Sequence, residues 1–119
     1  MKNSKTVSLP EVKKERLDSV ISFVLTEERI PAERKGYHYL ACAIEEVYAD
    51  REMAGAVSKS LYPAVARAFS TSPEAVERSI RTAIACAQTA KDGGRRKTNS
   101  EFIFQAAEQV KMLIDRGER

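Results

Sequence analysis

The chain of 119 residues has a mass of 13.3 kDa, 43% hydrophobic residues and a net charge of +3, which together indicate one small domain with a modest core. It has no tryptophan, only 5 glycines and 4 prolines, and this composition favours helices over a sheet. Its one histidine and two cysteines do not stand at metal-ligand spacing, and no apolar run reaches transmembrane length, so we expect no metal, no cofactor and a cytoplasmic protein that does not contact membranes.

The N-terminal part of the chain predicts a polar tail followed by a long helix. Residues 1–8 are mostly polar and are expected to be disordered, so that a single helical domain spans residues 9–119. A helix is predicted from Leu9 or Pro10 to Glu28, where the string Arg29-Ile30-Pro31 breaks it. The apolar stripe of this helix is Leu17, Val20, Ile21, Val24 and Leu25.

Two further helices are predicted before the middle of the chain. The first runs from Ala32 to Asp50, and Gly36 near its start either allows close approach of another backbone or simply loosens the first turn. Its inner residues are Tyr37, Leu40, Ala41, Ile44, Val47 and Tyr48. A shorter helix is expected from Glu52 to Ser60, and Pro63 should open the helix that follows.

The segment 61–82, LYPAVARAFSTSPEAVERSIRT, predicts two helices joined by a tight turn. In the first helix, Ala66 is a small residue at the point where a second helix must cross closely. Ser72 is a good N-cap for the second helix, because its hydroxyl can accept a hydrogen bond from a first-turn backbone N–H that has no carbonyl partner within the helix. Pro73 suits the first helical position, where no N–H is needed.

The second helix of this pair has one apolar face and one charged face. Val76 and Ile80 stand four residues apart and are expected to be buried. The outward residues are Glu74, Glu77, Arg78 and Arg81. The spacing is that of a helix-turn-helix, whose second helix lies in the DNA major groove. An ordinary αα-hairpin with a solvated charged face fits the bare pattern about equally well.

The second helix should continue through Ile84, Cys86 and Ala87 into a basic connector, Lys91 to Lys97. Cys86, like Cys42, stands among apolar residues and is expected to be a buried, reduced core thiol.

The charges of the chain are unevenly distributed. Residues 1–52 carry 9 Lys and Arg against 10 Asp and Glu, whereas residues 53–119 carry 11 against 7. The basic excess therefore lies in the half that holds the helix-turn-helix, as a phosphate-binding surface requires. Arg95, Arg96 and Lys97 either contact phosphates or only solvate a loop.

A last helix is predicted to start at Thr98 or Asn99, because Thr98 and Glu101 have capping-box spacing, and to end at Gly117. Its core stripe is Phe102, Ile103, Ala106, Val110, Leu113 and Ile114. The predicted fold is therefore all-α, a compact domain of five to six helices containing a helix-turn-helix.

Several short strings along the chain carry a resemblance to a known family. They are Ile30-Pro31-Ala32, Lys35-Gly36-Tyr37, Tyr39-Leu40, Ala43-Ile44, Val47-Tyr48, Leu61-Tyr62-Pro63, Val76-Glu77-Arg78, Ile80-Arg81, Ala83-Ile84 and Thr98-Asn99-Ser100-Glu101-Phe102-Ile103. On these strings the chain resembles the C-terminal DNA-binding effector domain of the sporulation master response regulator of endospore-forming bacteria. The resemblance runs in order from about Val20 to Met112, and generic helical patterning does not require the Thr-Asn-Ser-Glu-Phe string.

The resemblance implies a double-stranded DNA partner, whose major groove receives the helix from Pro73. Glu77 and Arg78 fall where the family places base-contacting residues, and Arg81 lies one turn further along the same face. Ser72, Glu74 and Thr82 complete the DNA-binding residues predicted on this helix. The family binds DNA as tandem head-to-tail copies, a contact that the spacing of the DNA boxes holds together. We therefore expect the free protein to be a monomer and to form a tandem dimer on DNA. We also expect contact with the transcription machinery.

Three departures from the family pattern affect these expectations. We expect no phosphorylatable receiver domain, because too few residues precede Leu9 to hold one. The segment between the second helix of the motif and the last helix is shortened to the basic connector. Thr82 stands where the family tends to have a histidine beside the DNA. Control by phosphorylation and the exact target sequence are therefore open.

The sequence thus predicts a sequence-specific DNA-binding transcription regulator with no catalytic site. The alternative is a helical protein-interaction module that no longer binds DNA. An enzyme is disfavoured because His38 stands in an aromatic run, without a residue pattern that would make it a base.

Overall fold

The computed structural model describes residues 11–89 and 96–117, and the predicted tail 1–8 lies outside these ranges. Within them the chain forms five α-helices and two short helical turns, and no strand. The elements in order are α1 (Glu11–Glu27), α2 (Lys35–Ala49), η1 (Arg51–Gly55), η2 (Val57–Leu61), α3 (Tyr62–Phe69), α4 (Pro73–Thr89) and α5 (Asn99–Asp115). The all-α fold is confirmed.

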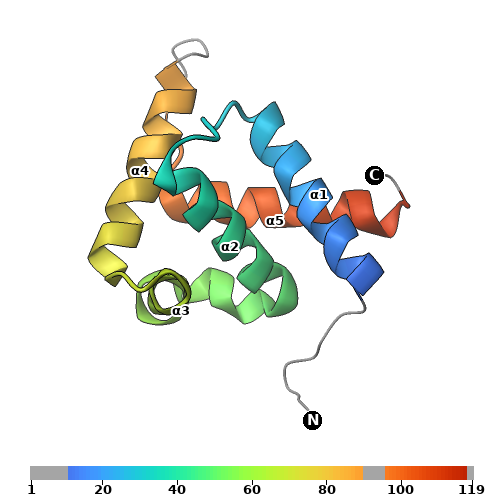
Figure 1. Ribbon diagram of the computed structural model, residues 1–119, viewed down its shortest axis with the longest axis horizontal. Coiled ribbons are helices and arrows are strands. Elements are labelled where there is room, and N and C mark those ends of the chain that lie inside the picture. Colours follow the sequence, from blue (N-terminus) through green and yellow to red (C-terminus); the bar gives the residue numbers. More distant parts are fainter. Residues whose placement is uncertain (1–10, 90–95, 118–119) are drawn as a thin grey trace.

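Helix α2 is the centre of the fold. It lies between α1 and α4, with α5 crossing behind it, and it packs against all three (Figure 1). One continuous core joins these helices. Its largest fully buried side chains are Phe102, Leu17, Leu25, Leu40, Ile44, Leu61, Ile80, Ile84 and Ile103. Among the helices that the structure describes, none is both long enough and apolar enough to cross a membrane.

The break after α1 is where the sequence predicts it. Arg29 adopts a left-handed conformation with φ of 66°, and the Ile30 amide donates to the Leu25 carbonyl at 3.0 Å, which closes the end of the helix. The next helix begins at Lys35 and not at Ala32, because residues 31–34 form a turn in which the Arg34 amide donates to the Pro31 carbonyl.

The prediction of a single helix from Glu52 to Ser60 is wrong. Asp50 accepts a hydrogen bond from the Glu52 amide and starts the 3-10 turn η1, which ends at Gly55. The chain then makes a wider π-type turn, η2, in which the Leu61 amide donates to the Ala56 carbonyl. Pro63 has no N–H and its ring excludes the carbonyl four residues earlier, so a regular helix cannot run through this point.

The start and end of α5 are confirmed. The Thr98 hydroxyl accepts from the Glu101 amide and the Glu101 side chain accepts from the Thr98 amide, forming the predicted capping box. Gly117 has φ of +76°, the left-handed conformation that commonly follows a helix end.

The prediction that both cysteines are buried in the core is wrong. Cys42 and Cys86 are reduced thiols, but each is only half-buried on the flank of its helix. Burial nevertheless raises the pKa of the Cys42 thiol to about 11, with the carboxylates of Glu46 and Glu45 contributing. The thiolate form of Cys42 is therefore scarce at neutral pH.

Candidate nucleic-acid interface

Helices α3 and α4 are joined by a three-residue turn. Ser70 ends α3 in the left-handed conformation, with φ of 54° and ψ of 50°. The Thr71 amide donates to the Ala66 carbonyl at 3.0 Å, which satisfies one of the last carbonyls of α3. The Ser72 hydroxyl accepts from the Ala75 amide at 3.1 Å, and Pro73 is the first residue of α4. These contacts form the helix-turn-helix that the sequence predicts.

Ala66 lies in the core, where α3 packs against α4, and is 3% exposed. We expect Ala66→Leu to overpack this crossing and to lower the free energy of unfolding by about 1–3 kcal/mol. Ala68→Leu is the matched control, because Ala68 is on the same helix but is exposed. Urea denaturation of both variants is the measurement, and equal stability of the two would show that the helices do not cross closely at Ala66.

The outer face of α4 carries the predicted DNA-binding residues. At about 100° per residue, Arg78 points almost directly away from the buried Val76 and Ile80. Glu74, Arg81 and Thr82 lie within about 60° of Arg78 around the helix and are also exposed. Glu77 lies about 100° away from Arg78, which agrees with its half-buried position.

The two arginines of this face have different surroundings. The Arg81 guanidinium donates to the carboxylate of Glu77 one turn earlier, so these side chains form an ion pair on the helix surface. Within the described part of the chain, no hydrogen bond or ion pair holds Arg78. Arg78 is therefore the arginine that can approach a base without first leaving a protein partner.

Asn99, which sequence reasoning did not select as a site residue, connects both helices of the motif to α5. Its side-chain amide donates to the Tyr62 hydroxyl at 3.0 Å and to the backbone carbonyl of Glu77 at 3.1 Å. Burial raises the pKa of the Tyr62 phenol, although the bond from Asn99 acts in the opposite direction, so the hydroxyl is protonated at neutral pH. The distinctive Thr-Asn-Ser-Glu-Phe string was the available signal for this role.

We expect Asn99→Ala to lower the free energy of unfolding by about 1–3 kcal/mol, because it leaves two part-buried oxygens without their donor. Ser100→Ala, at the exposed neighbouring position, is the control and should change stability little. Thermal melts followed by circular dichroism measure both. An Asn99→Ala protein as stable as the control would mean that the bridge does not secure α4.

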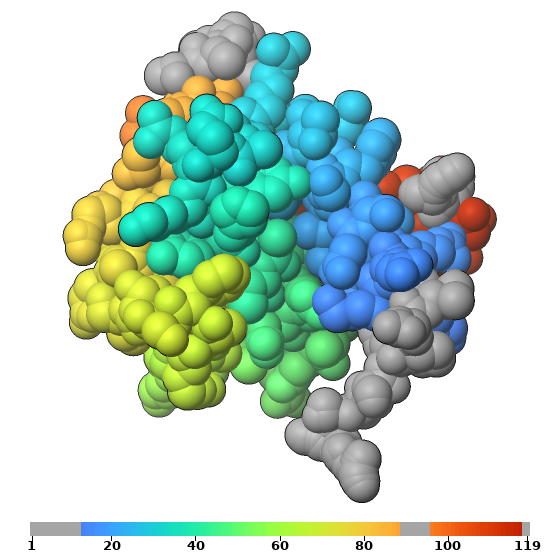
Figure 2. All heavy atoms as spheres, in the orientation of Figure 1, coloured from blue at the N-terminus to red at the C-terminus, as the bar shows by residue number. Residues whose placement is uncertain are grey.

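The start of α2 lies directly against α4 on one face of the molecule (Figure 2). An ideal Cβ built on Gly36 would lie 2.3 Å from the Ser79 carbonyl oxygen and 2.7 Å from the Ala83 Cβ. Of the two interpretations of Gly36 from sequence, close backbone approach is therefore correct. The resulting open hollow is lined by Glu33, Arg34, Lys35, Gly36, Arg78, Ser79 and Thr82.

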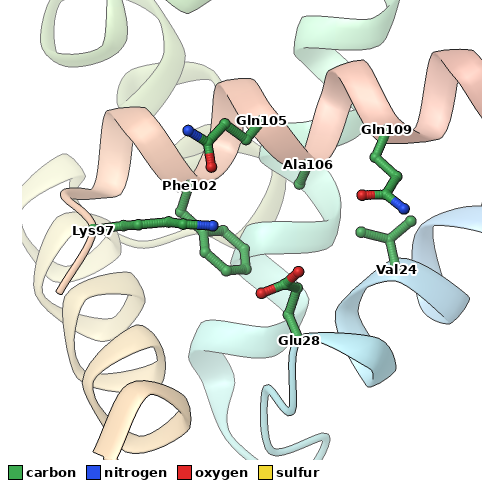
Figure 3. A pocket seen from close by; sticks show the side chains of 7 residues that line it. All are labelled: Val24, Glu28, Lys97, Phe102, Gln105, Ala106 and Gln109. Carbon is green, nitrogen blue, oxygen red and sulfur yellow. The ribbon is translucent and has the colours of Figure 1, made fainter. Parts of the chain in front are cut away.

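Of the predicted phosphate-binding residues of the connector, the two that the structure describes, Arg96 and Lys97, do not line the hollow beside Arg78. Arg95 lies outside the described residues, and Arg96 is exposed just before α5. The Lys97 amide donates to the Gln88 side chain at 2.9 Å, and its ammonium lies 5.8 Å from the centre of the Phe102 ring. Figure 3 shows this side chain extending across a small pocket of about 60 Å³ that Glu28 also lines.

An all-α domain with an α3–turn–α4 motif and an arginine-bearing outer helix face belongs to the helix-turn-helix class. The family model described as "Sporulation initiation factor Spo0A C terminal" matches residues 21–94, which is more than half of the chain. The chain belongs to this family, the DNA-binding effector domain of the sporulation regulator, and the resemblance noted in its sequence is confirmed over these residues. The match includes α2, α3 and α4 and ends before α5.

Proposed function

We propose that this protein is a sequence-specific transcription regulator that reads promoter DNA with α4 in the major groove. It acts in the cytoplasm by binding, without catalysing a reaction. The observation that carries the proposal is the position of Arg78, exposed, without a protein partner among the described residues and opposite the buried face of α4. Arginine can bond to guanine O6 and N7 together, and Glu77 can accept from a cytosine amine.

The other predicted site residues have supporting roles in this proposal. Ser72 fixes the start of α4 through its cap. Glu74 lies in the first turn of α4, where its negative charge interacts favourably with the positive end of the helix dipole. Arg81 and Thr82 flank Arg78 and contact the neighbouring base edges or phosphates. The connector residues Arg95, Arg96 and Lys97 add phosphate contacts that carry no sequence information.

The resemblance to the family implies that α4 reads a short G·C-containing box in promoters. The test is a fluorescence-anisotropy titration of the protein with a duplex carrying this box, and with a scrambled duplex of the same composition. We expect clearly tighter binding to the box at every salt concentration. Equal affinity for the two duplexes would contradict sequence reading. Absence of binding to both would instead favour the protein-interaction module that the sequence leaves as the alternative.

We further propose that the free protein is a monomer and that two copies meet only on DNA with adjacent boxes, where contact with the transcription machinery follows. Head-to-tail neighbours make a heterologous contact, which DNA spacing can hold together without a closed interface. Sedimentation of the free protein is the measurement, and we expect a mass of one chain. A stable dimer at micromolar concentration without DNA would show that the chain carries its own assembly interface.

A further inference from the structure

We propose that Arg34 and Lys35 form a clamp for one backbone phosphate of the DNA that α4 reads, beside the base contact proposed for Arg78. This inference rests on the proposed function, and it assigns a role to two residues outside the helix-turn-helix. Arg34 and Lys35 are exposed and line the same open hollow as Arg78 and Thr82. Three cationic side chains from two separate parts of the chain therefore surround one hollow at the edge of the predicted reading face.

The charge of the hollow suits an anion. Its ionisable lining is Arg34, Lys35 and Arg78 against the single carboxylate of Glu33, which gives a net charge of +2 by formal count. The first turn of α2 carries no acidic residue, and no side chain caps it. The positive end of the α2 dipole is therefore not offset by its own first turn and adds to the charge of the two side chains.

Gly36 makes the geometry of this clamp rigid. Because its Cα lies against the backbone of Ser79, the residues immediately before it cannot move away from α4 without separating two packed helices. The backbone of Arg34 and Lys35 is thus held at a fixed place relative to α4. A phosphate contact of this kind sets the register of a reading helix, so that base contacts fall on the correct bases.

The ligand is a phosphate of duplex DNA because of where the hollow lies. It opens to solvent beside the outer face of α4, and Thr82 and Arg78 belong to both surfaces. When a helix enters the major groove, the backbone phosphates run along its two sides. The side of α4 toward α2 is lined by cations at the point where one of these strands must pass.

The first experiment compares Arg34→Gln and Lys35→Gln with Lys13→Gln, which removes one exposed charge from α1, on the far side of α2 from α4 (Figure 1). Affinity is measured by anisotropy on the box and on the scrambled duplex over a series of salt concentrations. Combined in one protein, Arg34→Gln and Lys35→Gln should lower the slope of log K against log salt by about 0.9, the value for one phosphate, on both duplexes alike. Each substitution alone should lower the slope by part of that amount. The ratio of the affinities for the box and for the scrambled duplex should stay at the wild-type value in the clamp variants. Lys13→Gln should leave the slope unchanged.

The second experiment locates the phosphate. Single phosphates of the box duplex are replaced by uncharged methylphosphonates, and each duplex is titrated with wild type and with Lys35→Gln. We expect one position where the replacement weakens wild-type binding but not that of the variant, since the two changes remove the same contact. Equal slopes for Lys35→Gln and Lys13→Gln, or strictly additive losses at every phosphate, would overturn the clamp while leaving the proposed function intact. Wild-type protein that binds neither duplex would overturn the proposed function, and the clamp with it.

Discussion

Replacing Arg78 with alanine is expected to remove most of the discrimination between the promoter box and scrambled DNA while the fold is retained. Arg78 is exposed and makes no hydrogen bond or ion pair among the described residues, so its loss leaves the core unchanged. One bidentate contact to guanine is worth about 1–3 kcal/mol, which corresponds to a loss of roughly 5- to 150-fold in the ratio of the two affinities. Anisotropy titrations on both duplexes measure that ratio.

Arg78→Lys is the informative control, because lysine keeps the charge but lacks the planar fork that matches O6 and N7 of guanine. We expect this variant to retain its affinity for scrambled DNA and its salt dependence, yet to discriminate nearly as poorly as Arg78→Ala. Thermal melts should place both variants within about 0.5 kcal/mol of wild type, as is usual for surface substitutions. Discrimination at the wild-type level in Arg78→Ala would assign base reading to other residues.

Replacing Gly36 with alanine should destabilise the fold. The added methyl would lie 2.3 Å from a backbone oxygen of α4, which cannot turn aside as a flexible side chain can. Overpacking of this kind costs about 1–3 kcal/mol, and for a domain of this size that corresponds to a melting temperature lower by about 4–12 °C. Because relief requires α4 to move away from α2, affinity for the box duplex should fall as well.

Gly55→Ala is the matched control. A Cβ at Gly55 would have no heavy atom within 4 Å, so the same chemical change should be neutral or slightly stabilising there. Calorimetry or circular dichroism melts of the two variants, followed by titration with the box duplex, complete the comparison. If Gly36→Ala melted like Gly55→Ala, the close contact of α2 with α4 would not be needed for the fold.

The parts of the fold that local chemistry decides could be predicted from sequence. The start of α5 follows from one capping box, and the start of α4 follows from Ser72 and Pro73, so both were correct to the residue or within one. The segment 52–60 could not be predicted, because its residues are acceptable in a regular helix. Its two irregular turns depend on Pro63 and on how the chain must enter α3.

The candidate site also has one part that could be predicted from the sequence and one part that could not. The outward direction of Arg78 follows from helical spacing alone, once Val76 and Ile80 are taken as buried. The hollow beside it does not, because Arg34 and Lys35 are more than 40 residues away along the chain. Only the packing of α2 on α4 brings them to Arg78. Asn99 was missed for a similar reason, since its two acceptors belong to α3 and α4.

The Asn99 bridge also bears on how such domains can diverge. The start of α5 is fixed by its own capping box and by the hydrogen bonds of Asn99 to Tyr62 and Glu77. The position of α5 therefore does not depend on the length of the preceding connector. Doubling a loop costs only about 0.6 kcal/mol in closure entropy. Insertions and deletions between α4 and α5 can therefore accumulate during evolution with little penalty, and the connector is the natural place for lineages to acquire or discard additional contacts.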